Sequence, residues 1–247
     1  MKAEFEFVEF GKQNFSGYTL IEGFPGMGLV GTIAAKYLVE KLDFENVGYI
    51  DSNVFQPIIR IHKGLPVRPA RVYANKKKKI AVLLAEQVIP GHYAFLAAKK
   101  TVDWIKSKGV KELISLSGIQ AAPQTPDKEI IYGIAANTES KDLLKKYGLK
   151  EISEGITTGV TALMLLELKK SDFKAISILA NVEMTADYKA SAEVLKKLNE
   201  ILGLNLDVEP LLKEAKETQK MLIEQLQKLK TTKDSAERFE TKTPLIT

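Results

Sequence analysis

Five short apolar runs recur along the chain, and each has the length of a buried strand. They lie at 18–22, 47–51, 80–86, 112–118 and 175–181 and read YTLIE, VGYID, IAVLLAE, ELISLSG and AISILAN. Nearly every position in them is apolar, whereas a strand with one face in water alternates apolar and polar residues. Such runs indicate strands covered on both faces, as in a parallel sheet between two layers of helices.

Helical patterns separate these predicted strands. Residues 92–108 carry apolar side chains at steps of three and four, and Gly109 stands where the pattern ends. The ranges 157–169 and 186–202 have the same periodicity. Strands that alternate with helices predict a three-layer α/β domain with a mostly parallel sheet, and we assign residues 1–205 to this core domain.

The pattern changes after the core domain. Pro210 is suited to the first turn of a helix, and apolar residues then recur at alternating steps of four and three. This spacing predicts an amphipathic C-terminal helix over 206–232, which either forms a coiled-coil seam or docks along the domain. Residues 233–247 are polar and predict a flexible tail. The tail nevertheless ends on apolar residues, either by chance or because it is a docking peptide.

Composition narrows the functional classes. The 247 residues include 36 basic and 31 acidic ones, and most of these charges are interleaved, which favours a solvated surface over a nucleic-acid interface. The one basic block, Lys76 to Lys79, lies between two strand-like runs and predicts a solvated hairpin loop. We therefore expect no nucleic-acid partner.

The composition argues against a metal-binding, a disulfide-bonded or a membrane protein. The chain has no cysteine and only two histidines, His62 and His92, which argues against a metal site. No apolar run reaches about 18 residues, and the N-terminal residues do not form a signal peptide. We expect a soluble cytoplasmic protein without membrane contact.

A glycine-rich loop follows the first predicted strand. The segment GFPGMGLVG, residues 23–31, contains G-x-G-x-x-G at Gly26, Gly28 and Gly31, and a helical pattern follows it. Asp51 closes the next apolar run, as in the dinucleotide-binding fingerprint. A nucleotide-binding, Rossmann-like or nucleoside-phosphorylase-like enzyme that uses the loop Gly26–Gly31 is therefore one hypothesis.

The position of this loop favours a different interpretation. In a Rossmann loop the first glycine follows the strand almost at once, whereas here four residues, including Phe24, intervene. Pro25 also removes a backbone donor from the region that would hold phosphate. The glycines then allow a tight turn and close packing of a helix on the sheet or of one subunit on another.

Two further segments raise catalytic hypotheses. Glu86 and His92 flank a loop after a predicted strand and could form an acid–base pair, although a salt bridge and a helix start explain them as well. The segment NVEMTADY, 181–188, is similar to a Val-Glu-Met-Glu segment with which some nucleoside phosphorylases hold ribose. The second carboxylate is Thr185 here, so the segment hints at a related fold whose site is lost.

Four segments together resemble a known family. LIEGFPGMGLVGTIAAKYLVEKL, then Gln56-Pro57, then LLAEQVIPGH and LISLSGIQ are similar, in that order, to archaeal members of the proteasome assembly chaperone family. The likeness runs from about residue 17 to 205. Its most specific element is the signature loop, namely Gly23, Phe24, Pro25, Gly26, Gly28 and Gly31.

The resemblance implies a fold and a function. The fold is a nucleoside-phosphorylase-like α/β fold without catalysis or a cofactor. The protein would form a homo-oligomer, a tetramer or a pentamer, that binds the α-subunits of the proteasome core particle. It would act as an assembly chaperone, as an ATP-independent activator, or as both.

The resemblance also gives the C-terminal tail a role. Partners of the core particle commonly insert a C-terminal hydrophobic–Tyr–any tripeptide between α-subunits. Leu245 matches the hydrophobic position and Thr247 supplies the terminal carboxylate, whereas Ile246 replaces the tyrosine. A single such tail binds weakly, but several tails on one oligomer bind with avidity.

Overall fold

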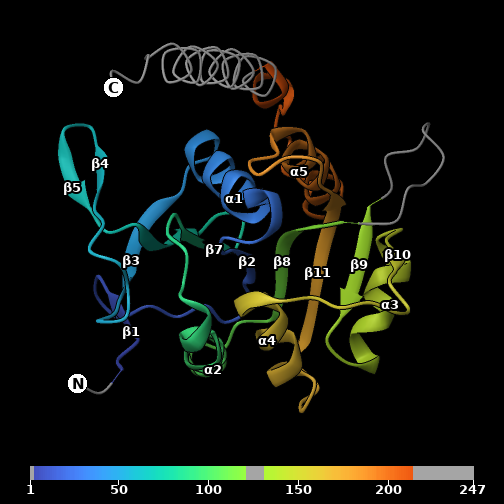
Figure 1. The fold of residues 1–247 in the computed structure, drawn as a ribbon, viewed down its shortest axis with the longest axis horizontal. Coiled ribbons are helices and arrows are strands. Elements are labelled where there is room, and N and C mark those ends of the chain that lie inside the picture. The colour runs from blue at the N-terminus through green and yellow to red at the C-terminus, as the bar shows by residue number, and fades with distance from the viewer. Residues whose placement is uncertain (1–2, 121–130, 214–247) are drawn as a thin grey trace, which may run out of the picture.

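The computed structural model describes residues 3–120 and 131–213, which form three layers around one large sheet (Figure 1). Within these ranges nine strands pair in the order β1-β3-β6-β7-β2-β8-β11-β9-β10. Their bounds are β1 Glu6–Glu9, β2 Thr19–Gly23, β3 Glu45–Asp51, β6 Ala70–Asn75, β7 Ile80–Ala85, β8 Glu112–Ile119, β9 Tyr132–Ala135, β10 Lys150–Glu151 and β11 Lys174–Asn181.

The centre of this sheet is parallel. Strands β7, β2, β8 and β11 pair with one another in parallel, and almost all of their residues are buried. These are four of the five apolar runs, so the predicted α/β class is confirmed. Antiparallel strands flank this centre: β6, β3 and β1 lie on one side and β9 on the other. The fifth apolar run forms β3, and β6 and β7 are the two strands of the predicted hairpin.

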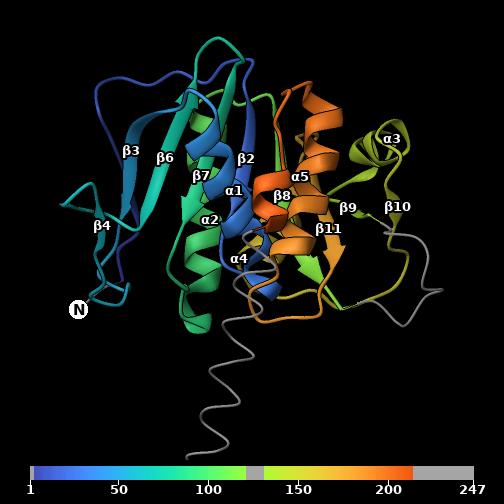
Figure 2. The same ribbon diagram turned by 90° about the horizontal axis from the view of Figure 1, so that it is seen from above.

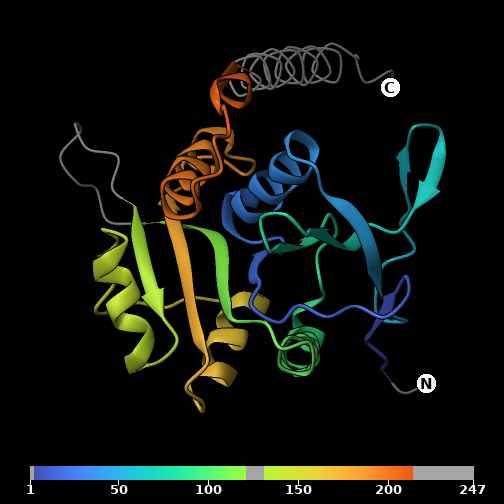
Figure 3. The same cartoon turned by 180° about the vertical axis from the view of Figure 1, so that it is seen from behind.

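Helices cover both faces of the sheet. Figures 1 and 3 show α1 (Val30–Lys41) and α5 (Tyr188–Leu202) on one face, and α2 (Ala94–Ser107) and α4 (Gly159–Leu168) on the other. Helix α3 (Thr138–Lys146) packs beside β9. The helices that were predicted at 92–108, 157–169 and 186–202 correspond to α2, α4 and α5.

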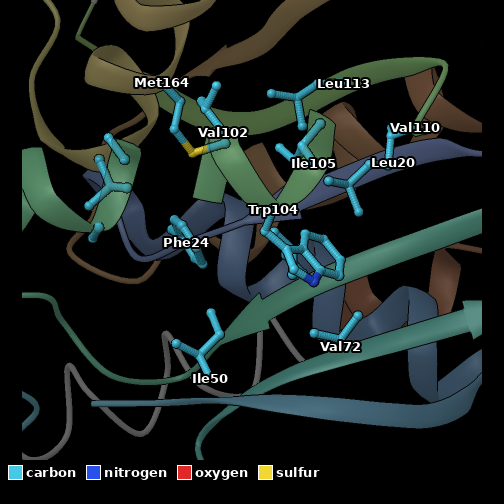
Figure 4. Packing of buried hydrophobic residues seen from close by; sticks show 14 of the residues in the cluster. Leu20, Phe24, Ile50, Val72, Val102, Trp104, Ile105, Val110, Leu113 and Met164 are labelled. Atoms are coloured by element: carbon cyan, nitrogen blue, oxygen red, sulfur yellow. The ribbon is translucent and has the colours of Figure 1, made fainter. Parts of the chain in front are cut away.

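The core is divided between the two faces. Successive residues of a strand point to opposite sides, so Leu20 contributes to the cluster under α2 and α4, and Ile21 to the cluster under α1 and α5. Figure 4 shows the first cluster, in which Trp104 and Met164 come from the two covering helices. Both clusters consist of apolar side chains on either side of the same strands, which explains the lack of alternation in the central strands.

Short elements complete the described chain. The 3-10 helices η1 (Met27–Leu29) and η2 (Gly91–Tyr93) precede α1 and α2. Strands β4 (Arg60–His62) and β5 (Leu65–Val67) form a separate hairpin away from the large sheet (Figure 2). The lysine block is the exposed loop between β6 and β7, as predicted.

Helix α5 ends at Gly203, whose φ of +58° suits glycine. Residues 209–213 are again helical, which places the start of the predicted C-terminal helix near Pro210. The rest of 206–232 and the tail 233–247 lie outside the described residues, so these domain boundaries stay predictions. None of the described helices combines the length and the apolar character needed to cross a membrane.

Candidate functional site

The signature loop leaves the carboxyl end of the central strand β2 and turns into α1. A Cβ atom on Gly31 would lie 2.2 Å from the Leu116 carbonyl oxygen, and a Cβ atom on Gly23 would lie 2.4 Å from the Cβ of Ala35. Real Cβ atoms do not approach other atoms so closely. These two glycines therefore let α1 lie directly on the sheet, and the packing interpretation is confirmed for them.

The other two glycines of the motif differ from each other. Gly28 has a φ of +63°, and a Cβ there would lie 2.6 Å from Val182 at the end of β11. Its carbonyl oxygen also accepts a hydrogen bond of 2.8 Å from the Asp187 N–H. Gly26 has an extended backbone, and the nearest atom to a Cβ would be the Ser117 Oγ at 3.6 Å. Gly28 is thus required by packing, whereas Gly26 has room for a Cβ atom at an ordinary contact distance.

The acidic residue of the apparent fingerprint lies in the wrong strand for nucleotide binding. Asp51 ends β3, which β6 and β7 separate from β2. Three strand spacings amount to about 14 Å. The Asp51 carboxylate instead pairs with Arg68 at 3.3 Å. Because a ribose-binding acid must end a strand next to the glycine loop, Asp51 does not belong to a site at this loop.

The candidate acid–base pair is not assembled. Glu86 lies between Arg60 and Arg71 and forms an ion pair with each, and the Lys36 Nζ is 4.0 Å away. His92 is exposed in η2, where its ring lies against Tyr93 with 4.0 Å between the centroids. The alternative that Glu86 forms a salt bridge within the chain is confirmed.

The segment that is similar to a ribose-binding sequence caps a helix. The buried Asp187 accepts hydrogen bonds from the Ala190 N–H at 2.8 Å and from the Glu183 N–H at 2.9 Å. The first of these bonds satisfies a free donor in the first turn of α5. Thr185 lies exposed in the turn between these groups. The segment therefore holds the start of α5 in place.

A cleft of about 900 Å³ opens at the carboxyl ends of the central strands. The signature loop, the loop after β7, the end of β8 and residues 150–161 line it. Met27, Val88 and Ile156 are exposed apolar residues on its rim. Open α/β sheets bind their ligands at this edge, so the cleft is the candidate functional site. The sequence did not reveal it because loops far apart in the chain form it.

A buried carboxyl group lies beside this cleft. Glu22 is the penultimate residue of β2 and is fully buried. It accepts hydrogen bonds from the Phe24 N–H at 2.7 Å and from the Thr161 hydroxyl at 3.0 and 3.2 Å. Thr161 itself lines the cleft. Burial raises the pKa of Glu22, and the hydrogen-bonding groups around it, Ser115, Phe24 and Thr161, offset this only in part. The sequence showed Glu22 merely as the acid that ends an apolar run.

This raised pKa predicts a specific pH dependence of stability. The unfolded chain releases the Glu22 proton near the ordinary value of 4.5, whereas the folded chain retains it to higher pH. The free energy of unfolding therefore falls as the pH rises from 4.5 to the folded pKa. Glu22→Gln should remove this fall and match or exceed the wild type at pH 7. Urea unfolding at several pH values measures the effect.

Two further variants control this measurement. Glu6→Gln removes a carboxylate from an exposed position of β1 and should keep the wild-type pH profile. Glu22→Ala leaves the donors of Phe24 and Thr161 without an acceptor and should cost about 1–3 kcal/mol. A pH profile of Glu22→Gln that is identical to that of the wild type would contradict the raised pKa.

Comparison with known proteins identifies the family. Residues 20–226 match the PAC2 family. An uncharacterized protein of Methanocaldococcus jannaschii is 33% identical over 220 residues, which cover 89% of this chain and 90% of that protein. The family match extends across the central strands, the signature loop and the cleft.

Two crystal structures from Pyrococcus furiosus have the same fold. PbaA, described as an archaeal homolog of proteasome-assembly chaperone, is 31% identical, with a TM-score of 0.80 over 96% of this chain and 98% of that one. PbaB, described as an archaeal proteasome activator, is 24% identical, with a TM-score of 0.75 over 90% and 98% of the two chains. The PbaB likeness concerns the fold alone. With the family match over most of its length, this chain belongs to the PAC2 family.

Proposed function

We propose that this protein is a non-enzymatic, cytoplasmic homo-oligomer, a tetramer or a pentamer, that docks on the α-ring of the proteasome core particle. It acts there as an assembly chaperone, as an ATP-independent activator, or as both. The observation that carries the proposal is the likeness to PbaA, which extends over 96% of this chain at 31% identity. The signature loop quoted above lies within the matched region.

The environment of the charged groups supports a binding role without catalysis. Glu86 is engaged by two arginines, and Glu22 is buried beneath Thr161. Three of the loop glycines are needed for packing, which leaves Gly26 facing the cleft. The Glu22 carboxyl group is fully buried, and both Glu86 oxygens are in ion pairs, so neither group is presented to a substrate. An apolar cleft rim suits a protein partner better than a phosphate ester.

The proposed anchor is the C-terminal tripeptide Leu245, Ile246 and Thr247, which lies outside the described residues. Its support comes from the sequence: a polar segment is followed by the apolar residues Pro244, Leu245 and Ile246. Each tail alone would bind weakly because it must be ordered on binding. An oligomer presents several tails to a ring of repeated pockets, so the tails bind with avidity.

Electron microscopy of the full chain mixed with purified core particle tests the proposal. We expect density that caps the ends of the particle, over the α-rings, and co-elution of the two proteins in gel filtration. The number of subunits in the cap gives the oligomeric state. Bare particles at micromolar protein, together with separate elution, would refute docking on the core particle.

A further inference from the structure

The hairpin formed by β4 and β5 has a tight and rigid tip. His62 pairs with Leu65, so only Lys63 and Gly64 form the turn. Both have positive φ, +50° and +78°. Two-residue turns of this kind match the twist of the flanking strands and fix their register. The hairpin is therefore a defined projection and not an irregular loop.

This hairpin is apolar on both sides near its tip. Ile61 pairs with Pro66, so the two side chains share one face of the ribbon, while Leu65 shares the other face with His62. Ile59, Ile61 and Leu65 are 63%, 62% and 67% exposed. Nearer the body, Arg60 attaches the hairpin through its ion pairs with Glu86 and Glu40.

Such a ribbon requires a partner surface. The hairpin forms its own two-stranded sheet and projects from the body at the side of the large sheet (Figures 1 and 2). An isolated two-stranded ribbon is marginally stable in water. Exposed aliphatic residues that cluster in this way mark an interaction site. Because both faces of the tip are apolar, the tip is suited to insertion between two walls, and not to lying flat on a surface.

The same chain offers a complementary surface, the cleft at the carboxyl ends of the central strands. Ten large apolar side chains are exposed in the described residues, and seven belong to these two places. Four are in or next to the hairpin and three are on the cleft rim: Ile58, Ile59, Ile61 and Leu65, and Met27, Val88 and Ile156. A contact between the hairpin of one molecule and the cleft of another would bury both sets at once. A contact between two hairpins would leave the cleft rim exposed.

The charged residues at the hairpin tip and in the cleft are compatible with a contact between the two surfaces. The hairpin tip carries the exposed Lys63, and the exposed charged residues that line the cleft are Glu151 and Glu154 together with Lys150. When the tip enters the cleft, the apolar residues on both surfaces are buried and these opposite charges can meet at the edge. A charge pair at the edge of an interface contributes little affinity but orients the two surfaces.

We propose that the hairpin tip of one copy inserts into the cleft of the next copy. This inference rests on the homo-oligomer that is part of the proposed function. The contact joins two different surfaces, so it is heterologous and generates a closed ring when the rotation between neighbours closes. The cleft is then a subunit interface and not a site for a small ligand.

Disulfide cross-linking tests the contact without background, because the chain has no cysteine. Lys63→Cys is produced with one affinity tag and Glu154→Cys with another, and the two single variants are refolded together. We expect oxidation to link the two tags, because the two introduced thiols lie next to each other wherever the hairpin of the first variant enters the cleft of the second. Links between two Lys63→Cys chains would show contact from hairpin to hairpin and overturn the proposal. If the wild-type protein forms oligomers but the mixed variants give no link between the two tags, the proposal is overturned as well.

A charge in the hairpin gives an independent measurement. Ile61→Asp should raise the dissociation constant of the oligomer roughly tenfold or more in sedimentation velocity, because it places a carboxylate in an apolar contact. Its melting temperature at low concentration should not change, since Ile61 is exposed. Leu166→Asp is the matched control on α4, 57% exposed and outside both surfaces, and should assemble normally.

The outcomes separate this inference from the proposed function. A wild-type protein that remains monomeric at micromolar concentration would refute the homo-oligomer and with it the hairpin contact. An oligomer that Ile61→Asp leaves unchanged would refute the hairpin contact alone. Docking on the core particle is measured separately, by electron microscopy.

Discussion

Deletion of residues 243–247 should abolish detectable binding of the protein to the proteasome core particle. In the proposed function these residues carry the docking tripeptide, and every subunit of the oligomer loses it at once. Avidity between several weak contacts can exceed the affinity of one contact by about 10²–10⁴, so the apparent affinity should fall at least 100-fold. Surface-immobilised core particle and biosensor measurements give this ratio directly. The fold and the oligomer should persist, because the described core domain ends far before the deleted segment.

Point variants of the tail identify which of its chemical groups act. Leu245→Asp keeps the length of the tail but removes the hydrophobic position, and it should weaken binding as strongly as the deletion. Ile246→Tyr supplies the ring and hydroxyl that this tail lacks, and it should increase hydrolysis of peptides by the closed core particle if the tail opens the gate. Thr243→Ser is the matched control and should change neither quantity. An affinity of the deletion variant equal to that of the wild type would eliminate the tail as the anchor.

The parts of the fold that were predicted are those in which one sequence pattern has one structural meaning. A continuous apolar run between helices becomes a strand covered on both faces, and β2, β7, β8 and β11 follow this rule. Strand β6 was indicated only as the strand-like run before the lysine loop and not as one of the buried apolar runs, because it contains the buried Arg71 and Asn75. Arg71 is tolerated there because Glu86 compensates its charge. That compensation depends on a contact between distant parts of the chain, which local periodicity does not encode.

The site was less predictable than the fold, for the same reason. The spacing from Gly31 to Asp51 fits the dinucleotide fingerprint, but strands β6 and β7 lie between β3 and β2 in the sheet. Strand order is a non-local property that no spacing reports. Glu22 is similar: its burial and the approach of Thr161 arise only when α4 packs on the sheet. A glycine needed for close packing and a glycine that holds a phosphate look alike in sequence. Gly31 and Gly26 differ only in the atoms that surround them in the folded protein.

This difference between the two glycines predicts a large contrast in stability. Gly31→Ala places a methyl group closer than 3.0 Å to the Leu116 carbonyl oxygen, which belongs to a central strand and cannot move aside like a flexible side chain. In an open helix the same change would stabilise by about 1 kcal/mol. Overpacking a core typically costs about 1–3 kcal/mol, and the rigid obstacle places Gly31→Ala at about 3 kcal/mol. For a chain of this size the melting temperature should fall by roughly 6–12 °C.

Gly26→Ala is the matched control in the same loop. Its backbone is extended, with φ −143°, and its nearest neighbour would be the Ser117 Oγ at an ordinary distance of 3.6 Å. The free energy of unfolding of Gly26→Ala should therefore stay within about 0.5 kcal/mol of the wild-type value. Thermal unfolding followed by circular dichroism gives the melting temperatures of both variants and of the wild type. A normal melting temperature for Gly31→Ala would contradict the packing role, and a selective loss at Gly31 explains why this loop is rich in glycine without a nucleotide.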